Sequence, residues 1–302
     1  MTDPHPQQPA WLYYKLYLAE HHDRSDQALL QLGAGLRQLP GCARWFFIRY
    51  VDLGGMHLRV RVLPRAGHEA DLRAAVTGLL ERVAGELASY AGPDYVPMVT
   101  TPEMGRSDKR VLVGTGGVRI ESAVYEPEHE KYGARAEMPI AEQLFMASSQ
   151  VALAILEDEA AGRYTRKTLV PHLMRAGLQC FDPAPAARFW NHYALFWLGG
   201  ASPAAADWHG KFMSKGAQLR GHGLEVCGAE DALAPGARRQ LDAWRGALAR
   251  ARRAYLDQPQ RSADIGVLCF NFVHMMNNRL GLASLEESYM ATLLEQAEQV
   301  PA

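Results

Sequence analysis

The sequence R-Y-V-D-L-G-G-M-H-L-R-V-R (residues 49–61) decides the fold of the first part of this chain. It predicts a β-hairpin, because two runs of β-forming residues, 44–52 and 56–63, flank the turn-forming pair Gly54-Gly55. The strands of a hairpin are antiparallel, so we expect a mainly antiparallel sheet in this part of the chain.

One face of the predicted hairpin carries positive charge. Alternation along its second strand separates apolar from basic side chains, with Leu58, Val60 and Val62 on one face and His57, Arg59 and Arg61 on the other. Together with Arg49 on the partner strand, the basic residues predict an anion-binding surface, because a guanidinium binds a carboxylate through two hydrogen bonds and stays charged. A solvated strand face is the alternative interpretation.

The composition limits the class of protein. The 302 residues, 48% hydrophobic and 22% charged, can bury one large core or two smaller ones. A formal net charge of -1 gives no reason to expect a general nucleic-acid binder. The four cysteines are widely spaced, which argues against a zinc site, an iron–sulfur site or a disulfide scaffold and favours a reducing compartment.

Neither a targeting segment nor a membrane span is expected. Residues 1–9 are polar and proline-rich and lack the apolar core of a signal peptide. No run of about 18 apolar residues occurs, which argues against a transmembrane helix. The protein is therefore predicted to be cytoplasmic.

The first half of the chain mixes strand and helix patterns. We expect a strand at 11–19, a helix ending near residue 39 and capped by Asp23 or Ser25, a helix at 69–90, an exposed connection at 92–106, and strands at 110–113 and 118–125. With the hairpin, these elements predict a sheet-rich portion over residues 1–135.

The second half, residues 136–302, has a helical pattern. Six helices are predicted, at 140–159, 166–179, 184–198, 237–256, 262–280 and 284–299, whereas 201–235 fits no pattern. Pro139 suits a first helical residue, and Ser284 with Glu287 fits a capping box. The whole chain is thus predicted to be one α+β domain, with a mainly antiparallel sheet covered by the helical half.

The stretch F-N-F-V-H-M-M-N-N-R-L-G-L (residues 270–282) contains a candidate acid or base. On a helix, His274 and Asn278 lie one turn apart, so the Asn278 amide could orient the imidazole. Arg279 lies about 140° round the helix from His274 and need not point to the same place. A core histidine satisfied by a neighbouring amide is the alternative.

The stretch Y-E-P-E-H-E-K-Y-G (residues 125–133) follows a predicted strand. Tyr125, Glu128 and Tyr132 either line a cleft at the strand end or pair with the hairpin arginines; a charged surface turn is the alternative. Phosphate-binding, serine-hydrolase and zinc-protease motifs do not occur, so no metal and no cofactor are expected.

Four stretches in the same order resemble one family: W-L-Y-Y-K-L-Y (11–17), the hairpin (46–61), Y-E-P-E-H-E-K-Y-G (125–133) and H-M-M-N-N-R-L-G (274–281). They are similar to the C-terminal domain of class I lanthipeptide dehydratases, the SpaB C-terminal-like domain, which also occurs as a stand-alone protein of thiopeptide-type bacteriocin biosynthesis. The resemblance extends over nearly the whole chain.

The resemblance implies a lyase. In that family a partner domain uses glutamyl-tRNA to glutamylate Ser and Thr of a ribosomally made precursor peptide, and this domain then eliminates glutamate to leave dehydroalanine or dehydrobutyrine. It implies that Arg59 and Arg61 hold the glutamyl carboxylates or the enolate and that His274 transfers the proton. We expect Arg49, His57, Tyr125, Glu128, Tyr132, Asn278 and Arg279 to bind the peptide.

Two alternatives remain open at this stage. The same fold also serves thiopeptide pathways, in which a stand-alone protein joins two dehydroalanines by a formal [4+2] cycloaddition, forms a pyridine and releases the leader peptide. The second alternative is a non-catalytic subunit that binds the precursor peptide, leader plus core. The expected partners are this peptide and a separate glutamylation protein, with no direct nucleic-acid contact and no membrane span.

Overall fold

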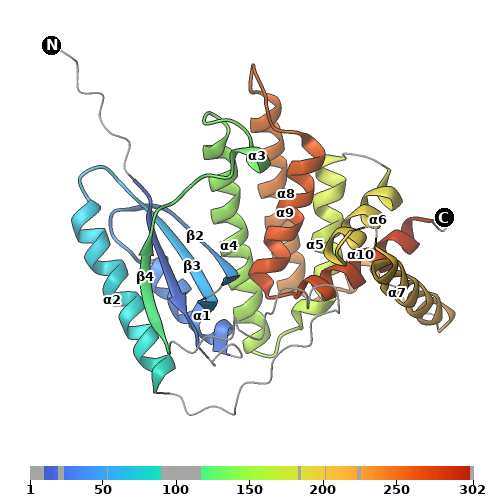
Figure 1. Ribbon diagram of the computed structural model, residues 1–302, viewed down its shortest axis with the longest axis horizontal. Coiled ribbons are helices and arrows are strands. Elements are labelled where there is room, and N and C mark those ends of the chain that lie inside the picture. Colours follow the sequence, from blue (N-terminus) through green and yellow to red (C-terminus); the bar gives the residue numbers. More distant parts are fainter. Residues whose placement is uncertain are drawn as a thin grey trace. The chain divides into compact units, whose positions relative to one another are not determined.

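The computed structural model describes residues 10–19, 24–52, 54–89, 117–182, 185–200, 202–222 and 226–299. The chain forms two compact units. The first comprises Met1–Met98 and Asp108–Pro127, and the second comprises Val99–Ser107 and Glu128–Ala302. The first is rich in strands and the second in helices, which confirms the α+β class (Figure 1).

The first unit contains a four-stranded sheet in the order β2-β3-β1-β4, in which every neighbouring pair is antiparallel. Its elements are β1 (Leu12–Tyr17), α1 (Ser25–Leu36), β2 (Cys42–Asp52), β3 (Gly55–Pro64), α2 (Glu69–Ala88) and β4 (Arg119–Ala123). The predicted hairpin is confirmed as β2 and β3, with Asp52 paired to Gly55 at its closed end. The predicted strand at 110–113 and connection at 92–106 lie outside the described residues.

One face of the sheet packs against α1 and α2. Leu58, Val60 and Val62 on β3 lie on this face and are all 0% exposed, as their alternation predicts. Tyr14 of β1 accepts a hydrogen bond from Thr77 of α2 at 3.5 Å, which places α2 over the same face. The opposite face carries His57, Arg59 and Arg61, so the predicted separation of apolar from basic residues is confirmed.

Arg49 corrects the prediction of the cationic surface. The register pairs Arg49 with Leu58, so its side chain lies on the helix-covered face and not beside Arg59. Its guanidinium donates to Ser25 Oγ at 2.6 Å and forms an ion pair with Asp26, both at the start of α1. Ser25 is the first helical residue and accepts from Arg49. The prediction that Ser25 caps this helix is therefore wrong.

The second unit is built from helices. They are α3 (His129–Tyr132), α4 (Met138–Ala160), α5 (Arg166–Phe181), α6 (Ala186–Trp197), α7 (Pro203–Gly221), α8 (Pro235–Leu256), α9 (Ile265–Leu280) and α10 (Ser284–Gln299), with a 3-10 turn at Glu230–Ala232. The six predicted helices are confirmed within a few residues at each end. Pro139 lies in the first turn of α4, as expected.

α7 was not predicted, because it buries little. Only Ala205 and Gly216 of its 19 residues are buried, so no apolar stripe marks it in the sequence. Ser202 caps its start by accepting from the Ala205 backbone N–H at 3.1 Å, and Pro203 follows at the first helical position.

α4 is long and apolar enough to cross a membrane by length and composition, and no other helix of the described residues is. In the structure, 61% of its most apolar window is buried inside the protein. Its buried side chains include Leu144, Val151 and Ile155, so α4 is a core helix of its unit.

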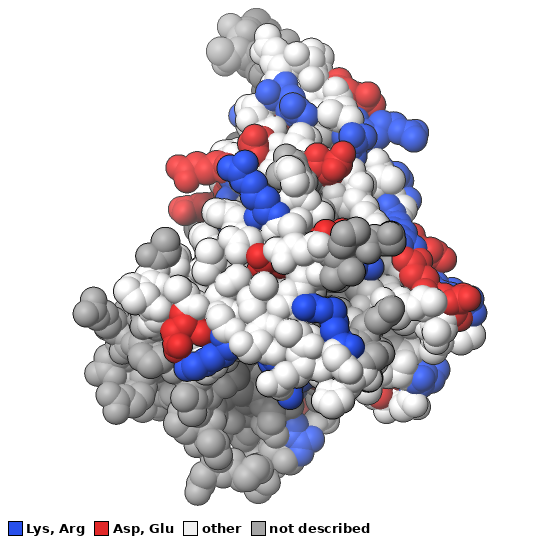
Figure 2. All heavy atoms as spheres, turned by 90° about the vertical axis from the view of Figure 1, so that its right-hand side faces the viewer, with Lys and Arg blue, Asp and Glu red and all other residues white. Residues whose placement is uncertain are grey.

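The surface of the helical unit carries both signs of charge. On the face in Figure 2, acidic and basic side chains are interspersed, and neither forms an extended patch there. This distribution agrees with the formal net charge of -1 for the whole sequence. It gives no electrostatic footprint for a nucleic acid on the face shown.

Candidate active site

The basic face of the sheet centres on Arg59. Its guanidinium lies 3.3 Å from the centroid of the Tyr50 ring, and its Nε–H donates to His57 Nε2 at 3.2 Å. Tyr50 faces His57 across the β2–β3 pair, so these three side chains form one stack. Within the described part of the chain, no carboxylate forms an ion pair with Arg59, which leaves its charge available for an anion.

His57 is a neutral support for Arg59 and not a third cation. It is 0% exposed, and its Nδ1 lies 3.1 Å from the Gly55 carbonyl oxygen, to which it donates. Its Nε2 must then accept from Arg59, as observed. Burial lowers the pKa of His57, which favours the same neutral form.

Arg61 lies among aromatic rings. Its guanidinium is 4.5 Å from the centroid of Tyr13, 5.3 Å from that of Phe46 and 5.1 Å from that of Tyr125. The residue is 8% exposed, and the three rings are close enough to interact with its positive charge. Tyr125 thus contacts a hairpin arginine, which agrees with the expectation that it pairs with these arginines.

The Asp52 carboxylate at the closed end of the hairpin has partners of its own. Asp52 accepts from Lys15 at 3.0 Å, from Tyr17 and from the Gly54 backbone N–H at 2.9 Å. Burial alone would raise the pKa of Asp52, but the hydrogen bonds from Lys15 and Gly54 outweigh it and hold that pKa below its usual value. Asp52 therefore stays ionised and committed to Lys15.

The second unit contains the predicted histidine in a buried polar network. Nδ1 of His274 on α9 lies 3.0 Å and 3.2 Å from the two carboxylate oxygens of Glu287 on α10. The Glu287 side chain is 1% exposed and that of His274 is 19% exposed. Since Nδ1 donates to the carboxylate, a neutral imidazole presents its lone pair at Nε2, the tautomer that a general base requires.

Two further side chains hold Glu287 in place. The Tyr193 hydroxyl of α6 donates to Glu287 Oε2, and Asn277 Nδ2 donates to the same oxygen at 3.2 Å. Burial raises the pKa of Tyr193 well above its usual value, and the Glu287 charge raises it further, so Tyr193 remains a donor. A carboxylate held by three donors orients the imidazole without needing a group from solvent.

Glu287 is the site residue that sequence reasoning misassigned. The predicted capping box of Ser284 and Glu287 is wrong, because α10 begins one residue earlier than that motif requires. Ala283 is the cap position: its carbonyl accepts from Glu287 N–H at 2.9 Å, and its own N–H donates to Glu286 at 3.0 Å. The Glu287 carboxylate is thus free of the cap and turns inward to His274.

Asn278 and Arg279 do not join this network. The residue that shares Glu287 with His274 is Asn277, one position before the predicted Asn278. Arg279 is 0% exposed, donates to Ser149 Oγ at 3.0 Å and to the Met275 carbonyl at 2.9 Å, and lies over the Phe145 ring. These contacts are those of a core residue, as its helical angle from His274 allows.

The stretch at 125–133 separates into an aromatic contact and a structural turn. Glu128 is exposed and forms an ion pair with Lys131 at 2.6 Å, within its own turn. Tyr132 is 2% exposed and packs edge-on against Phe145, while its carbonyl accepts from Tyr255. The roles of Glu128 and Tyr132 in peptide binding remain predictions.

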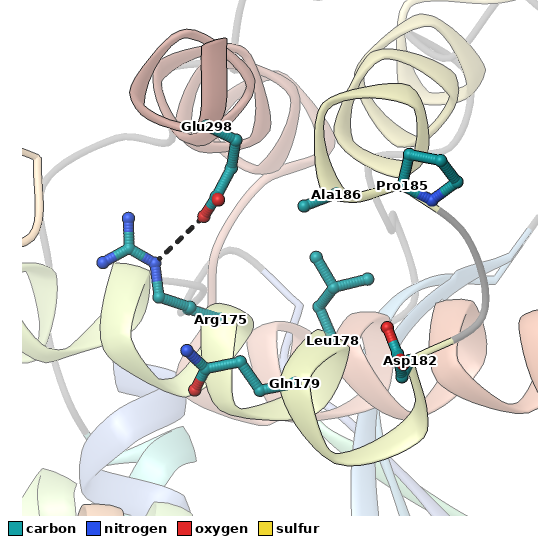
Figure 3. Close-up of a pocket in the computed structure, with 7 residues that line it drawn as sticks. All are labelled: Arg175, Leu178, Gln179, Asp182, Pro185, Ala186 and Glu298. Carbon is teal, nitrogen blue, oxygen red and sulfur yellow. Dashed lines mark ion pairs between the residues drawn. The ribbon is translucent and has the colours of Figure 1, made fainter. Parts of the chain in front are cut away.

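A separate pocket of about 430 Å³ lies between α5, α6 and α10 (Figure 3). It is lined by seven residues, Arg175, Leu178, Gln179, Asp182, Pro185, Ala186 and Glu298. Arg175 and Glu298 point toward one another and form an ion pair at 3.4 Å, shown as the dashed line. None of the site residues predicted from the sequence lines this pocket.

Three solved structures share this fold. One is the tRNA-dependent lantibiotic dehydratase MibB from Microbispora sp. 107891, which is 23% identical in sequence and has a TM-score of 0.57. The match covers 99% of this chain and 28% of the MibB chain. The pyridine synthase TbtD from thiomuracin biosynthesis has 18% identity, 95% and 97% coverage and a TM-score of 0.66. TsrL has 17% identity, 95% and 93% coverage and a TM-score of 0.53. This chain thus spans about a quarter of the length of MibB.

The sequence also matches one family model over nearly its whole length. The match covers residues 11–297 and includes both compact units, from the first strand to the last helix. No curated protein is significantly similar to the chain. The family acts on ribosomally made precursor peptides, which agrees with the predicted role of this chain in their modification. The chain belongs to the lantibiotic biosynthesis dehydratase C-terminal family.

Proposed function

We propose that this protein eliminates glutamate from glutamylated Ser or Thr residues of a precursor peptide. The observation that carries the proposal is the His274–Glu287 pair, because elimination needs a base at a carbon acid and a buried carboxylate fixes the tautomer of that base. The substrate is a peptide, as for the family as a whole.

The reaction balances without a cofactor. His274 Nε2 takes the Cα proton of the glutamylated residue, and the electron pair left on Cα forms the Cα–Cβ double bond. The Cβ–O bond breaks, and glutamate leaves with that bond's electrons as a carboxylate. The proton on His274 then passes to solvent, which the 19% exposure of its side chain permits.

Negative charge develops on the peptide carbonyl and on the departing carboxylate. We infer that Arg59 and Arg61 bind these anions, because a guanidinium offers paired N–H donors and its charge persists at every working pH. Arg59 has the aromatic and imidazole support for this role and no acidic partner among the described residues. Removing such a donor typically costs about 10²–10³ in rate.

The test uses a synthetic peptide that contains O-glutamylserine. The wild-type protein should release glutamate and leave dehydroalanine, detected by mass spectrometry. His274→Ala should lower the rate by about 10²–10⁴ because the base is lost, whereas His222→Ala, at an exposed position after α7, should act as wild type. Unchanged peptide with the wild-type protein would refute the proposal.

Pyridine formation is the second candidate. It is supported by the likeness to the pyridine synthase TbtD, which extends over 95% of this chain and 97% of that one. This candidate predicts that a peptide with two dehydroalanines is cyclised and cleaved from its leader. An unchanged dehydroalanine peptide, together with glutamate release in the first test, would leave elimination as the function.

The proposal also sets the partners and the compartment. A glutamylation protein must supply the substrate, since the elimination itself neither uses tRNA nor forms the ester. We propose that both proteins act in the cytoplasm on the same precursor peptide. Co-purification of this protein with that enzyme and peptide from the native host tests the partnership.

A further inference from the structure

Aromatic side chains of α6 and α9 lead directly to the imidazole of His274. The Trp197 ring lies 4.2 Å from the His274 ring, and the Phe270 ring stacks on Trp197 at 6.1 Å with planes 23° apart. Phe196 packs edge-on against Phe270 at 5.0 Å. These four rings form a continuous surface, here named the aromatic platform.

The platform is open at the end away from the network. Phe196 is 52% exposed and Val267, one turn before Phe270 and Asn271 on α9, is 39% exposed. Phe270, Asn271 and His274 follow Val267 at helical spacing, so they share its face of α9. Exposed apolar side chains that adjoin one another favour a binding surface, whereas single ones do not.

Packing stability alone does not explain why Phe196 is exposed. The interior of this unit already has an aromatic core in Trp190, Tyr193 and Phe272, all 1% exposed or less. A further ring packed only for stability would be covered, yet Phe196 leaves half of its surface in water. Phe196, Trp197 and Phe270, the platform rings beyond His274, carry no charge, so they suit an apolar group and not an ion.

We propose that the aromatic platform binds an apolar side chain of the precursor peptide next to the residue on which His274 acts. The occupant follows from continuity with the proposed site. When one peptide residue lies at His274 Nε2, the residues one or two positions away in the peptide lie next to Trp197 and Phe270. The inference rests on the proposed function for the identity of the substrate as a peptide. It adds a preference for apolar or aromatic residues beside the modified Ser or Thr.

The test compares two peptides of equal length and charge. Acetylated and amidated Gly-Gly-Phe-Ser-Phe-Gly-Gly and Gly-Gly-Asn-Ser-Asn-Gly-Gly are titrated into the full-length protein, and binding is followed by isothermal titration calorimetry. The wild type should bind the Phe peptide about tenfold more tightly, because a phenyl side chain is then withdrawn from water. Equal affinity for the two peptides would overturn the proposal.

The variants separate the platform from other aromatic residues. Phe196→Ala should reduce the preference to about threefold or less, and Phe196→Leu should retain most of it. Phe212→Ala, a half-buried ring of α7 that packs on Tyr289, should leave it unchanged. A preference that survives Phe196→Ala, in protein with unchanged circular dichroism, would place the apolar site elsewhere and sink the idea.

The binding readout also keeps this inference distinct from the reaction. Glutamate release without a preference for the Phe peptide would overturn the platform and leave the elimination standing. Preferential binding without glutamate release from an O-glutamylserine version would refute the elimination and leave the platform standing.

Discussion

At the scale of single residues, Glu287 is the side chain on which the proposed chemistry of the helical unit depends. It touches no substrate in the proposed reaction and acts only through His274, so it is a positioning residue. Its carboxylate is 1% exposed and accepts from His274, Tyr193 and Asn277. Such a group fixes the tautomer of the imidazole and stabilises the imidazolium that forms when the proton arrives.

Glu287→Gln tests this role. An amide of the same shape keeps an acceptor for Asn277 but loses the charge, so glutamate release should fall by about 10²-fold with little change in KM. Steady-state kinetics on the O-glutamylserine peptide separates the effect on kcat from that on KM.

Glu298→Gln, an exposed position on the same helix, is the matched control and should leave the rate of glutamate release unchanged. A Glu287→Gln variant with the wild-type kcat would show that the carboxylate serves only the packing of α10.

In each unit, the sequence predicts the half-buried candidate residue better than the fully buried ones. Arg59 stands out because basic side chains alternate with apolar ones along a strand, and His274 because it lies one turn from Asn278 on a predicted helix. Glu287 does not, since Ser284 and Glu287 fit a capping box equally well and the real cap uses Glu286. Tyr193 lies 94 residues before Glu287, and no local pattern connects them.

At the scale of elements, the β2–β3 hairpin was predictable because two signals agree. The alternation of side chains and the glycine pair at 54–55 both indicate one turn position. The face of Arg49 was not predictable, because a shift of one residue in register moves a side chain across the sheet. α7 was missed for the opposite reason, since a helix that buries only Ala205 and Gly216 leaves no periodic pattern.

A substitution at Gly55 tests the hairpin turn, and a substitution at Gly85 in α2 provides the comparison. Gly55 has φ of 109°, where a side chain is strained, so Gly55→Ala should lower the free energy of unfolding by about 1–3 kcal/mol. Gly85 lies in α2, and a Cβ added there would meet no atom within 4 Å, so Gly85→Ala should raise the free energy of unfolding by about 0.5–1 kcal/mol. Urea unfolding followed by circular dichroism measures both, and equal effects of the same sign would contradict the assigned turn.

At the scale of the whole molecule, carboxylates that accept hydrogen bonds or form ion pairs make the fold sensitive to acid. Hydrogen bonds or ion pairs lower the pKa of Asp52, Glu137, Glu230 and Glu286 below their usual values. Glu137 illustrates the cause: burial opposes its charge, but Ser262 and the backbone N–H groups of Ala134, Ser262 and Ala263 donate to it and prevail. Each carboxylate therefore binds its proton more readily in the unfolded chain.

The sign of the pH dependence follows. The stabilisation from Glu137 is complete above pH 4.5, the usual pKa of glutamate, and is lost as the pH falls through the lower pKa of the folded state. The free energy of unfolding should therefore decrease steadily below pH 4.5. Glu137→Gln should cost about 2 kcal/mol at pH 7 and flatten this decrease, as thermal melts from pH 7 to 3 would show. A melt profile as steep as that of the wild type would contradict the assignment.

The stack of Arg59 on Tyr50 has a consequence for how an anion is captured. A free arginine loses roughly 2 kcal/mol of rotamer entropy when a ligand fixes it. Arg59 is already held flat against the ring and tied through Nε to His57, so most of that loss belongs to folding and not to binding. An incoming carboxylate therefore meets a guanidinium with one orientation, which favours rapid docking of a planar, two-oxygen group over a single-point anion such as chloride.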